Sequence, residues 1–339
     1  MQTVVLEQPG SLALRETPPP EGTLPQDEAL VRVQRVGVCG SDLKAFKGEM
    51  PFLSYPRVLG HELGVEILEI GPNAAGLRAG DRAAVEPYLH CGHCIACRRG
   101  RTNCCDSLRV LGVHTDGGMR EFIRVPVGKL HPSDKLSLDQ LALVETLVIG
   151  AHAIRRGAPR PDDCLLVIGV GPIGLTVIAS AAAIGVDIIA MDVNPARLEF
   201  AQEMPGVSHV VDARDRPLER LAEITDGDMP TQVYDASGSA AAMNASFDTL
   251  AMGGTLVFVG LVTDDITFHD PEFHRREMTV MSSRNGTAED FRQVIDMVET
   301  GAIDTTPWIT HRATPAELIH DLPTWLDPAS GCLKAMMQF

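Results

Sequence analysis

The sequence predicts an α/β protein of two domains, one β-rich and one built on a doubly wound parallel sheet. Its 339 residues exceed what a single ordinary hydrophobic core holds, so we expect about two domains. Short β-rich runs broken by proline and glycine occupy the first 150 residues. Beyond residue 150, short apolar runs alternate with stretches of helical length. This change of pattern marks the predicted domain boundary.

The region 1–150 is predicted to form an irregular β or barrel-like domain. Its β-rich runs are TVVLEQ, ALVRVQRVGV, LGVEILEIG and DRAAVEP, and helical periodicity is scarce. Proline and glycine separate these runs, which is typical of tight turns between short strands. We therefore expect strands here rather than helices.

The region 151–285 is predicted to form the parallel sheet. Its apolar runs are CLLVIGV, DIIAMDV, HVVDA, QVYDAS and TLVFVGLV, and Ala-, Leu- and Glu-rich stretches separate them. Buried strands joined by crossover helices indicate a doubly wound sheet. The remaining segment, 286–339, contains a helical pattern in TAEDFRQVIDMVETG and a strand-like end in CLKAMMQF. We expect this tail to return to the first domain.

Composition excludes several classes of partner. Hydrophobic residues make up 45% of the chain and charged residues 22%, which is typical of a globular protein rather than a disordered one. The formal net charge of -16 repels phosphate backbones and anionic lipid headgroups, so we expect neither nucleic acid nor membrane as a partner. A signal-peptide pattern and an apolar run of ~18 residues are both missing from the sequence, which favours a cytoplasmic location.

A cluster of cysteines indicates a metal site. Five of the eight cysteines fall between residues 91 and 105, and four of them form the pattern C-x2-C-x2-C-x7-C: Cys91, Cys94, Cys97 and Cys105. Four thiolates suit a tetrahedral Zn²⁺ site that is closed to substrate and therefore structural. An iron–sulfur run would place its next cysteine three residues on and before proline, and neither feature occurs. Cys104 is an alternative fourth ligand, and buried thiols without metal are the other interpretation.

A second metal site is indicated by residues that lie far apart in the sequence. Cys39 in GVCGSD and His61-Glu62 in LGHELG offer a thiolate, an imidazole and a carboxylate, each flanked by glycine. Three protein ligands and an open position make a catalytic zinc site at which an alcohol can bind. Glu145, in LVETLVIGAH, is a further carboxylate that could reach the metal or its water, or could be an ordinary glutamate at a helix N-terminus.

A glycine-rich turn predicts a dinucleotide site. The segment Gly169-Val170-Gly171-Pro172-Ile173-Gly174 follows an apolar strand and begins an Ala-rich helix, so backbone N–H groups at a helix start can receive a pyrophosphate. Asp192 ends the next strand, where an acidic residue binds ribose hydroxyls and repels a 2′-phosphate. We therefore favour NAD over NADP, although nearby Arg197 could accommodate that phosphate.

In combination, these motifs resemble a known enzyme family. GVCGSD, GHE, the four-cysteine segment and GVGPIG occur in the order and approximate spacing of the zinc-dependent alcohol dehydrogenases of the medium-chain dehydrogenase/reductase family, over essentially the whole chain. The resemblance implies a GroES-like catalytic domain over 1–150 and 286–339, with a structural zinc lobe at about 88–108, and a Rossmann NAD-binding domain over 151–285. It also implies two zinc ions per chain, one catalytic and one structural.

Within that family the chain resembles a carbohydrate-metabolising branch. Glu62 and Glu145 are similar to the polyol and sorbitol dehydrogenases, in which carboxylate partly replaces a second zinc cysteine. The segments SYPRVLGHE, GVHTDGG, DPEFHRRE and SSRNGTAEDF resemble bacterial hexonate 5-dehydrogenases that act on L-galactonate or L-gulonate. The branch implies a homodimer or homotetramer. Arg284, in SSRNG, matches a substrate-contact position of this branch, and a guanidinium can hold a hydroxyl or carboxylate.

The chain departs from the family at two positions. Many members carry a proton-relaying histidine five residues after the zinc cysteine, where this chain has Lys44, which we expect, with Arg284, to contact the substrate. An ordinary lysine is protonated at neutral pH and is a poor base, but Ser41 retains a hydroxyl that can start a relay. Thr146 replaces a proline that commonly follows the glutamate, and nothing follows from that change.

The sequence thus predicts a dehydrogenase that transfers hydride from a secondary alcohol of a polyol or sugar acid to NAD. Two alternatives remain: another zinc dehydrogenase of the family, for example of the threonine type, and a non-catalytic NAD-binding redox sensor that uses the cysteine segment. The sensor would have no open metal site, so metal content and alcohol-dependent NADH formation distinguish it from the enzymes.

Overall fold

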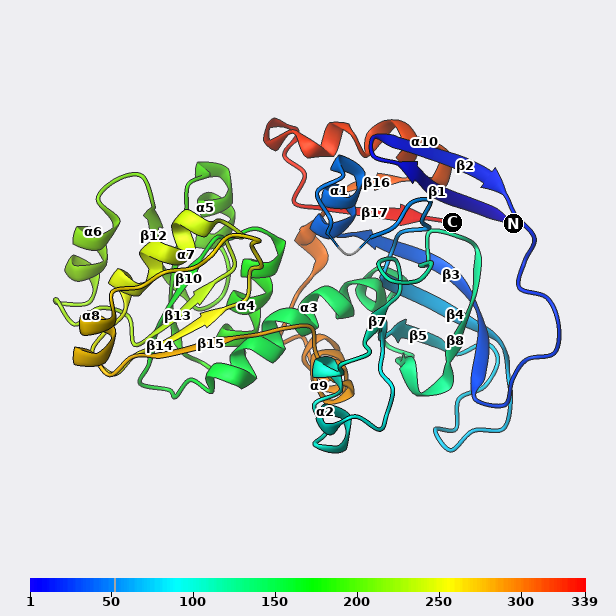
Figure 1. The fold of residues 1–339 in the computed structure, drawn as a ribbon, viewed down its shortest axis with the longest axis horizontal. Helices are drawn as coiled ribbons and strands as arrows, with labels where there is room; N and C mark the ends of the chain where they lie inside the picture. The colour runs from blue at the N-terminus through cyan, green and yellow to red at the C-terminus, as the bar shows by residue number, and fades with distance from the viewer. Residues whose placement is uncertain (52) are drawn as a thin grey trace. The chain divides into compact units, whose positions relative to one another are not determined.

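The computed structural model describes residues 1–51 and 53–339, which form two compact units. Unit 1 comprises Met1–Glu145 and Thr287–Phe339, and unit 2 comprises Thr146–Gly286 (Figure 1). The long helix α3, Leu138–Gly157, belongs to both, because residues 145 and 146 fall on opposite sides of the division. The predicted α/β class, with a doubly wound parallel sheet, is confirmed.

Unit 1 is built on a mixed sheet with the order β16-β17-β3-β4-β5-β9, in which β8 also pairs with β3. Two small sheets, β1-β2 and β6-β7, accompany it. The strands of unit 1 are β1 Gln2–Gln8, β2 Ser11–Glu16, β3 Glu28–Val38, β4 Glu62–Ile70, β5 Arg82–Val85, β6 Tyr88–Leu89, β7 Arg109–Val110, β8 Phe122–Pro126, β9 Leu130–Pro132, β16 Ile309–Ala313 and β17 Lys334–Gln338. Its helices are α1 Gly40–Lys47, α2 Ile95–Arg98, α9 Ala288–Glu299 and α10 Pro315–Asp321, with short 3₁₀ helices η1 Thr102–Cys104, η2 Val127–Lys129, η4 Thr306–Trp308, η5 Thr324–Leu326 and η6 Pro328–Ser330.

The C-terminal tail joins the sheet of unit 1. Strand β17 pairs antiparallel with β3, with Met336 opposite Gly37, and β3 pairs with β4, with Gly37 opposite Glu62. Three segments that are far apart in the sequence therefore lie side by side at Gly37. This arrangement allows side chains of β17 and β4 to meet across β3.

Unit 2 contains a six-stranded, all-parallel sheet with the order β12-β11-β10-β13-β14-β15. Its strands are β10 Cys164–Ile168, β11 Asp187–Asp192, β12 Val207–Asp212, β13 Gln232–Asp235, β14 Thr255–Phe258 and β15 Thr279–Ser282; its helices are α4 Pro172–Ala182, α5 Pro195–Gln202, α6 Pro217–Ile224, α7 Ala240–Ala245 and α8 Asp270–Arg275, with the 3₁₀ helix η3 Ser246–Thr249. Each of the five apolar runs expected to form strands does so. The edge strand β15 lies mostly exposed, which explains why no strongly apolar run marks it in the sequence.

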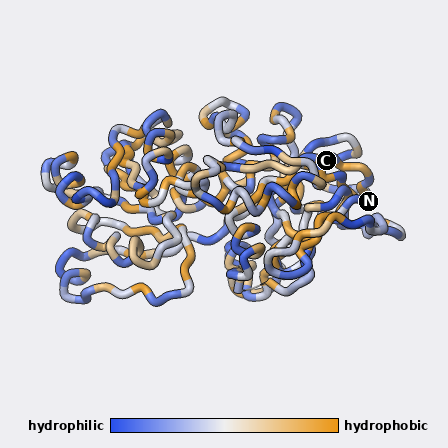
Figure 2. The backbone as a smooth tube through the Cα atoms, turned by 90° about the horizontal axis from the view of Figure 1, so that it is seen from above, coloured by the Kyte–Doolittle hydropathy of each residue, from blue (hydrophilic) through white to orange (hydrophobic). Residues whose placement is uncertain are grey.

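Aliphatic side chains fill both cores, as the low aromatic content requires. Figure 2 shows hydrophobic stretches of backbone mostly inside each unit and hydrophilic stretches mostly along its outer turns. Helix α9 illustrates the pattern, since Phe291, Val294, Ile295 and Val298 lie buried on one face at helical spacing. Thr287 and Asp290 form a capping box that begins this helix. No helix among the residues that the structure describes is long and apolar enough to cross a bilayer.

Candidate functional site

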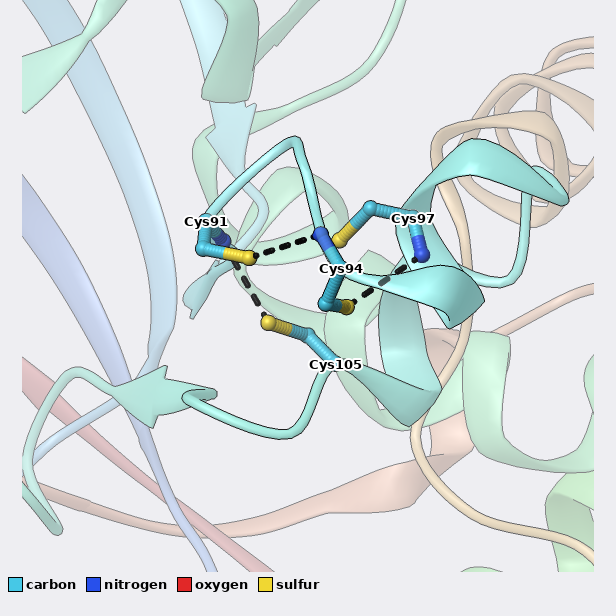
Figure 3. A group of neighbouring side chains, drawn as sticks. All are labelled: Cys91, Cys94, Cys97 and Cys105. Atoms are coloured by element: carbon cyan, nitrogen blue, oxygen red, sulfur yellow. Dashed lines mark hydrogen bonds between the residues drawn. The ribbon is translucent and has the colours of Figure 1, made fainter.

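Four cysteines of unit 1 converge as the sequence predicts. The sulfur atoms of Cys91, Cys94, Cys97 and Cys105 all lie within 4.8 Å of one another (Figure 3). Helix α2 and the turns around it bring them together, because backbone N–H groups donate to the thiols: Cys94 N to Cys91 Sγ at 3.4 Å, and Cys91 N to Cys105 Sγ at 3.3 Å. Cys104 is exposed and does not belong to this group, so the geometry selects Cys105.

The thiols of Cys94 and Cys97 in this group have widely different pKa values. N–H groups of Cys97 and Asp106 lower the pKa of Cys94 to about 6, whereas burial and the Cys94 thiol raise the pKa of Cys97 to about 12. Crowded thiols resist simultaneous ionisation unless a cation balances their charge. The donor set therefore fits a Zn²⁺ ion, which binds four thiolates tetrahedrally and deprotonates them.

The second predicted metal group also forms within unit 1. One ligand atom from each of Cys39, His61 and Glu62 lies within 4.8 Å of the others. Cys39 is the N-cap of α1, and the Asp42 carboxylate fixes it there by accepting a hydrogen bond from its backbone N–H at 2.9 Å. His61 directly precedes β4 and Glu62 begins it. A helix start and a strand start therefore present the three groups to one another.

Glu62 is held by a buried ion pair with Lys334. The Lys334 ammonium lies 2.5 Å from the carboxylate of Glu62, and both side chains are almost fully buried. The pair spans β3 at Gly37, where a Cβ atom would lie 2.0 Å from Glu62 Oε2. Glycine is therefore required at this point of β3. Because a carboxylate offers about four acceptor positions, Glu62 can accept from Lys334 and still bind a cation.

The electrostatics of this group favour a cation. Burial alone would lower the pKa of His61, but the Cys39 thiol and the carboxylates of Asp42 and Glu145 raise it well above 6.5. The pKa of Lys334 is raised in the same way, since Glu62, Cys39 and Glu145 outweigh burial. His61 Nδ1 and the Ser41 hydroxyl are buried without a hydrogen-bond partner among the described residues. A thiol, an imidazole with a free nitrogen and a carboxylate fit zinc.

Glu145 lies beside this group without belonging to it. Glu145 lies on α3 and its side chain is buried. Its Oε1 accepts a hydrogen bond from the hydroxyl of Tyr88 on β6. Burial raises the pKa of Glu145, and Glu62 raises it further, while His61 lowers it. The structure thus brings Glu145 within electrostatic reach of His61 but gives its carboxylate a separate partner.

The two predicted substrate residues are exposed. Lys44 lies on α1, one turn after Ser41, and its side chain faces solvent. Arg284 lies in unit 2 on the loop that follows β15. Lys44 belongs to unit 1 and Arg284 to unit 2.

The glycine turn of unit 2 adopts the geometry that its sequence predicts. Gly169 follows β10 with a φ of +82°, which favours glycine, and Pro172 occupies the first turn of α4. A Cβ atom on Gly174 would lie 1.9 Å from the carbonyl oxygen of Gly169, so strand and helix approach too closely for any side chain. Ile173 completes the first turn of α4. Such a turn leaves N–H groups at a helix start for a phosphate.

Asp192 ends β11 next to this turn. Its Oδ2 accepts a hydrogen bond from Val170 N at 2.8 Å, and its Oδ1 accepts from Asn194 N at 2.8 Å. Arg197 on α5 is partly exposed, with Nη1 4.0 Å from Asp192 Oδ2 and close to Gly171. The turn and the carboxylate are therefore adjacent, an arrangement that fits a dinucleotide, and the Arg197 guanidinium lies next to both.

Three site residues were not predicted from the sequence. Asp42 fixes Cys39, Tyr88 binds Glu145, and Lys334 binds Glu62. A local signal existed for Asp42, because it stands three residues after Cys39 in a capping-box pattern. A lysine in the apolar strand KAMMQ was a weaker signal for Lys334. Nothing in the sequence distinguished Tyr88.

Comparisons with known proteins cover both units. Residues 25–135 match the family described as "Alcohol dehydrogenase GroES-like domain", and residues 172–300 match "Zinc-binding dehydrogenase". Together these two matches span more than half of the chain. The first lies in unit 1, and the second covers unit 2 from α4 onward and extends into α9 of unit 1.

Individual relatives match almost end to end. L-galactonate-5-dehydrogenase of Escherichia coli K12 is 42% identical over 94% of each chain, and sorbitol dehydrogenase of Bacillus subtilis is 30% identical over 99% of this chain and 97% of its own. The crystal structure of a short chain alcohol dehydrogenase (rspB) from E. coli CFT073, complexed with NADH, superposes with a TM-score of 0.92 at 30% identity, covering 100% of this chain and 99% of the other.

Proposed function

Because this chain belongs to the zinc-dependent alcohol dehydrogenases and is an oxidoreductase of the polyol and sugar-acid type, we propose that it oxidises a secondary alcohol of a sugar acid with NAD. The observation that carries the proposal is the buried group of Cys39, His61 and Glu62 in a chain that also carries the glycine turn. A closed cysteine site alone would support only a structural metal.

In this proposal, Cys39, His61 and Glu62 hold a catalytic zinc, and Cys91, Cys94, Cys97 and Cys105 hold a structural one, which makes two ions per chain. Zinc, when bound, acts as a Lewis acid that lowers the pKa of a hydroxyl group by many units. The Ser41 hydroxyl, buried and without a partner among the described residues, would start a proton relay: it accepts the substrate's hydroxyl proton as it passes its own proton on toward solvent. Lys334 balances the charge of Glu62, and Asp42 keeps Cys39 at the start of α1.

For the cofactor we propose NAD rather than NADP, bound by the domain over 151–285. The turn from Gly169 to Gly174 receives the pyrophosphate, and the Asp192 carboxylate receives ribose hydroxyls and repels a 2′-phosphate. Arg197, whose Nη1 lies 4.0 Å from Asp192 Oδ2, is a cation that opposes this preference. A lower KM for NAD than for NADP supports the proposal, and the reverse order refutes it.

For the substrate we propose a hexonate oxidised at C5, such as L-galactonate or L-gulonate. The support is the 42% identity to an L-galactonate-5-dehydrogenase, together with the exposed cations Lys44 and Arg284, which suit a substrate carboxylate. The test is NADH formation with a panel of hexonates, polyols, threonine and simple secondary alcohols. A higher kcat/KM for hexonates is expected. If only aliphatic alcohols react, the sugar-acid assignment is wrong.

We propose further that the enzyme is a cytoplasmic homodimer or homotetramer. A reducing compartment keeps the four clustered thiols available for metal. Light scattering of the purified protein measures the subunit number directly.

A further inference from the structure

The hydrogen bond between Tyr88 and Glu145 has no assigned role, although it lies beside the Cys39, His61 and Glu62 group. Both residues are almost fully buried, with Tyr88 2% and Glu145 5% exposed. The charges of both Glu145 and Cys39 act on the Tyr88 hydroxyl and raise its pKa, after burial as the largest cause. Tyr88 therefore borders the same site as the metal-binding group.

The Tyr88–Glu145 hydrogen bond bears on how many protein groups can bind the metal. Cys39, His61, Glu62 and Glu145 are four groups that zinc binds readily, and four protein ligands make a closed site with no position for substrate. The geometry separates one of them from the rest, because Glu145 does not belong to the close group and one of its oxygens is bound to a hydroxyl. Glu62 has its own partner in Lys334 and remains within the close group.

The ring of Tyr88 is fixed by its packing. Phe291 of α9 meets it edge to face, with ring centroids 6.3 Å apart and planes at 71°. Phe291 in turn stacks on His131 at 4.7 Å, and His131 Nε2 lies 3.1 Å from Glu86 Oε2. Glu86 also pairs with Lys129. All the residues of this chain of contacts are buried, so they restrict rotation of the Tyr88 ring. Its hydroxyl is therefore kept within hydrogen-bond distance of Glu145.

We propose that Tyr88 is a positioning residue: its hydroxyl holds Glu145 outside the ligand set of the catalytic metal, so that one metal position stays open for the substrate. The inference rests on the proposed function of the same site. It assigns different roles to the two carboxylates, Glu62 as a ligand and Glu145 as a carboxylate kept off the metal. Without the phenolic hydroxyl, Glu145 turns onto the metal and closes the site.

The test uses the full-length protein with Co²⁺ in place of zinc and compares wild type, Y88F, E145Q and Y88F/E145Q. The Y88F variant keeps the ring and its contact with Phe291, so folding is retained. In Y88F we expect the visible Co²⁺ bands to shift as Glu145 binds the metal, and kcat to fall roughly 10- to 100-fold with the Kd of NADH unchanged. The shift is absent from Y88F/E145Q, and its kcat is no lower than that of E145Q, because Tyr88 acts through Glu145.

The matched control is Y234F. Tyr234 is also fully buried, and its hydroxyl donates to Gln232 at 2.7 Å within unit 2. The Y234F variant loses a buried phenolic hydroxyl, as Y88F does, so we expect its thermal midpoint to fall by an amount similar to that in Y88F. Its Co²⁺ spectrum and kcat should stay as in wild type.

Two results overturn the proposal: a Co²⁺ spectrum of Y88F identical to that of wild type, or kcat losses that multiply in the double variant. If Y88F does not fold, the spectrum of E145Q decides, since it matches wild type only when Glu145 is not a ligand. The spectra need no turnover. A wild type that forms no NADH from any alcohol therefore refutes the proposed function separately from this inference.

Discussion

At the scale of single residues, the site depends on charges that are buried in pairs. Lys334 and Glu62 are about 4% and 1% exposed, and each would be costly to bury alone. Their contact spans 272 residues of sequence, and it exists because Gly37 leaves room between the two strands that carry them. The ligand motif predicted Glu62 but not its partner, since no local pattern links residues so far apart.

Removal of the lysine should therefore destabilise the fold. In the metal-free protein, we expect K334M to lower the free energy of unfolding by about 3–5 kcal/mol, because it leaves the Glu62 carboxylate buried and uncompensated. Denaturant unfolding measures the change. K47M, at an exposed lysine of α1, is the control and should change stability by less than about 0.5 kcal/mol. A loss in K334M as small as the control's would contradict the account.

Glu86 provides a pH-dependent test at the same scale. Burial alone would raise its pKa, but hydrogen bonds from His131 and Lys129 lower it below the ordinary 4.5. A carboxyl whose pKa is lower in the folded state adds stability above its unfolded value and loses that stability as the pH falls through the folded value. The stability advantage of wild type over E86Q should thus narrow as the pH falls below 4.5. Thermal unfolding at several pH values measures the gap, with E49Q, in an exposed loop, as the control. A constant gap for E86Q would show that the charge is not what matters.

At the scale of elements, the sequence predicted what is encoded locally. The turn from β10 into α4 and the cysteine segment around α2 each lie within fifteen residues, so spacing alone specifies their geometry. Strands β10, β11, β13 and β14 were also evident, because mostly buried parallel strands are continuously apolar, and the edge strand β12 was evident from its run HVVDA. The other edge strand, β15, was not predicted, since it is mostly exposed and its sequence TVMS contains no long apolar run. Helix α3 was not predicted, since it continues through the predicted domain boundary.

The turn before α4 gives the prediction at this scale. G174A should weaken NADH binding at least tenfold, because the new Cβ would lie 1.9 Å from the Gly169 carbonyl and force strand and helix apart. NADH fluorescence titration measures the affinity. G128A is the matched control, since a Cβ there meets nothing within 4 Å. Equal NADH affinity in G174A and wild type would mean that this turn is not the pyrophosphate site.

At the scale of the whole molecule, family membership and the convergence of the two side-chain groups could be predicted, because several specific motifs occur together along one chain. The surroundings of the catalytic group could not. Lys334 contacts Glu62, Tyr88 contacts Glu145, and Phe291 packs on Tyr88, through pairing and packing of distant segments that only the folded chain brings together. Sequence patterns therefore predict candidate ligands, while tertiary structure determines the partners of each carboxylate.

The central claim is that Cys39 and His61 hold a metal that the reaction requires. The most direct measurement is zinc content together with alcohol-dependent NADH formation and NADH affinity in wild type, C39A and H61A. We expect about two zinc ions per chain in wild type and about one in each variant, with NADH formation lost and NADH affinity unchanged in both. Full NADH formation in either variant, or two zinc ions retained in both, would contradict the account.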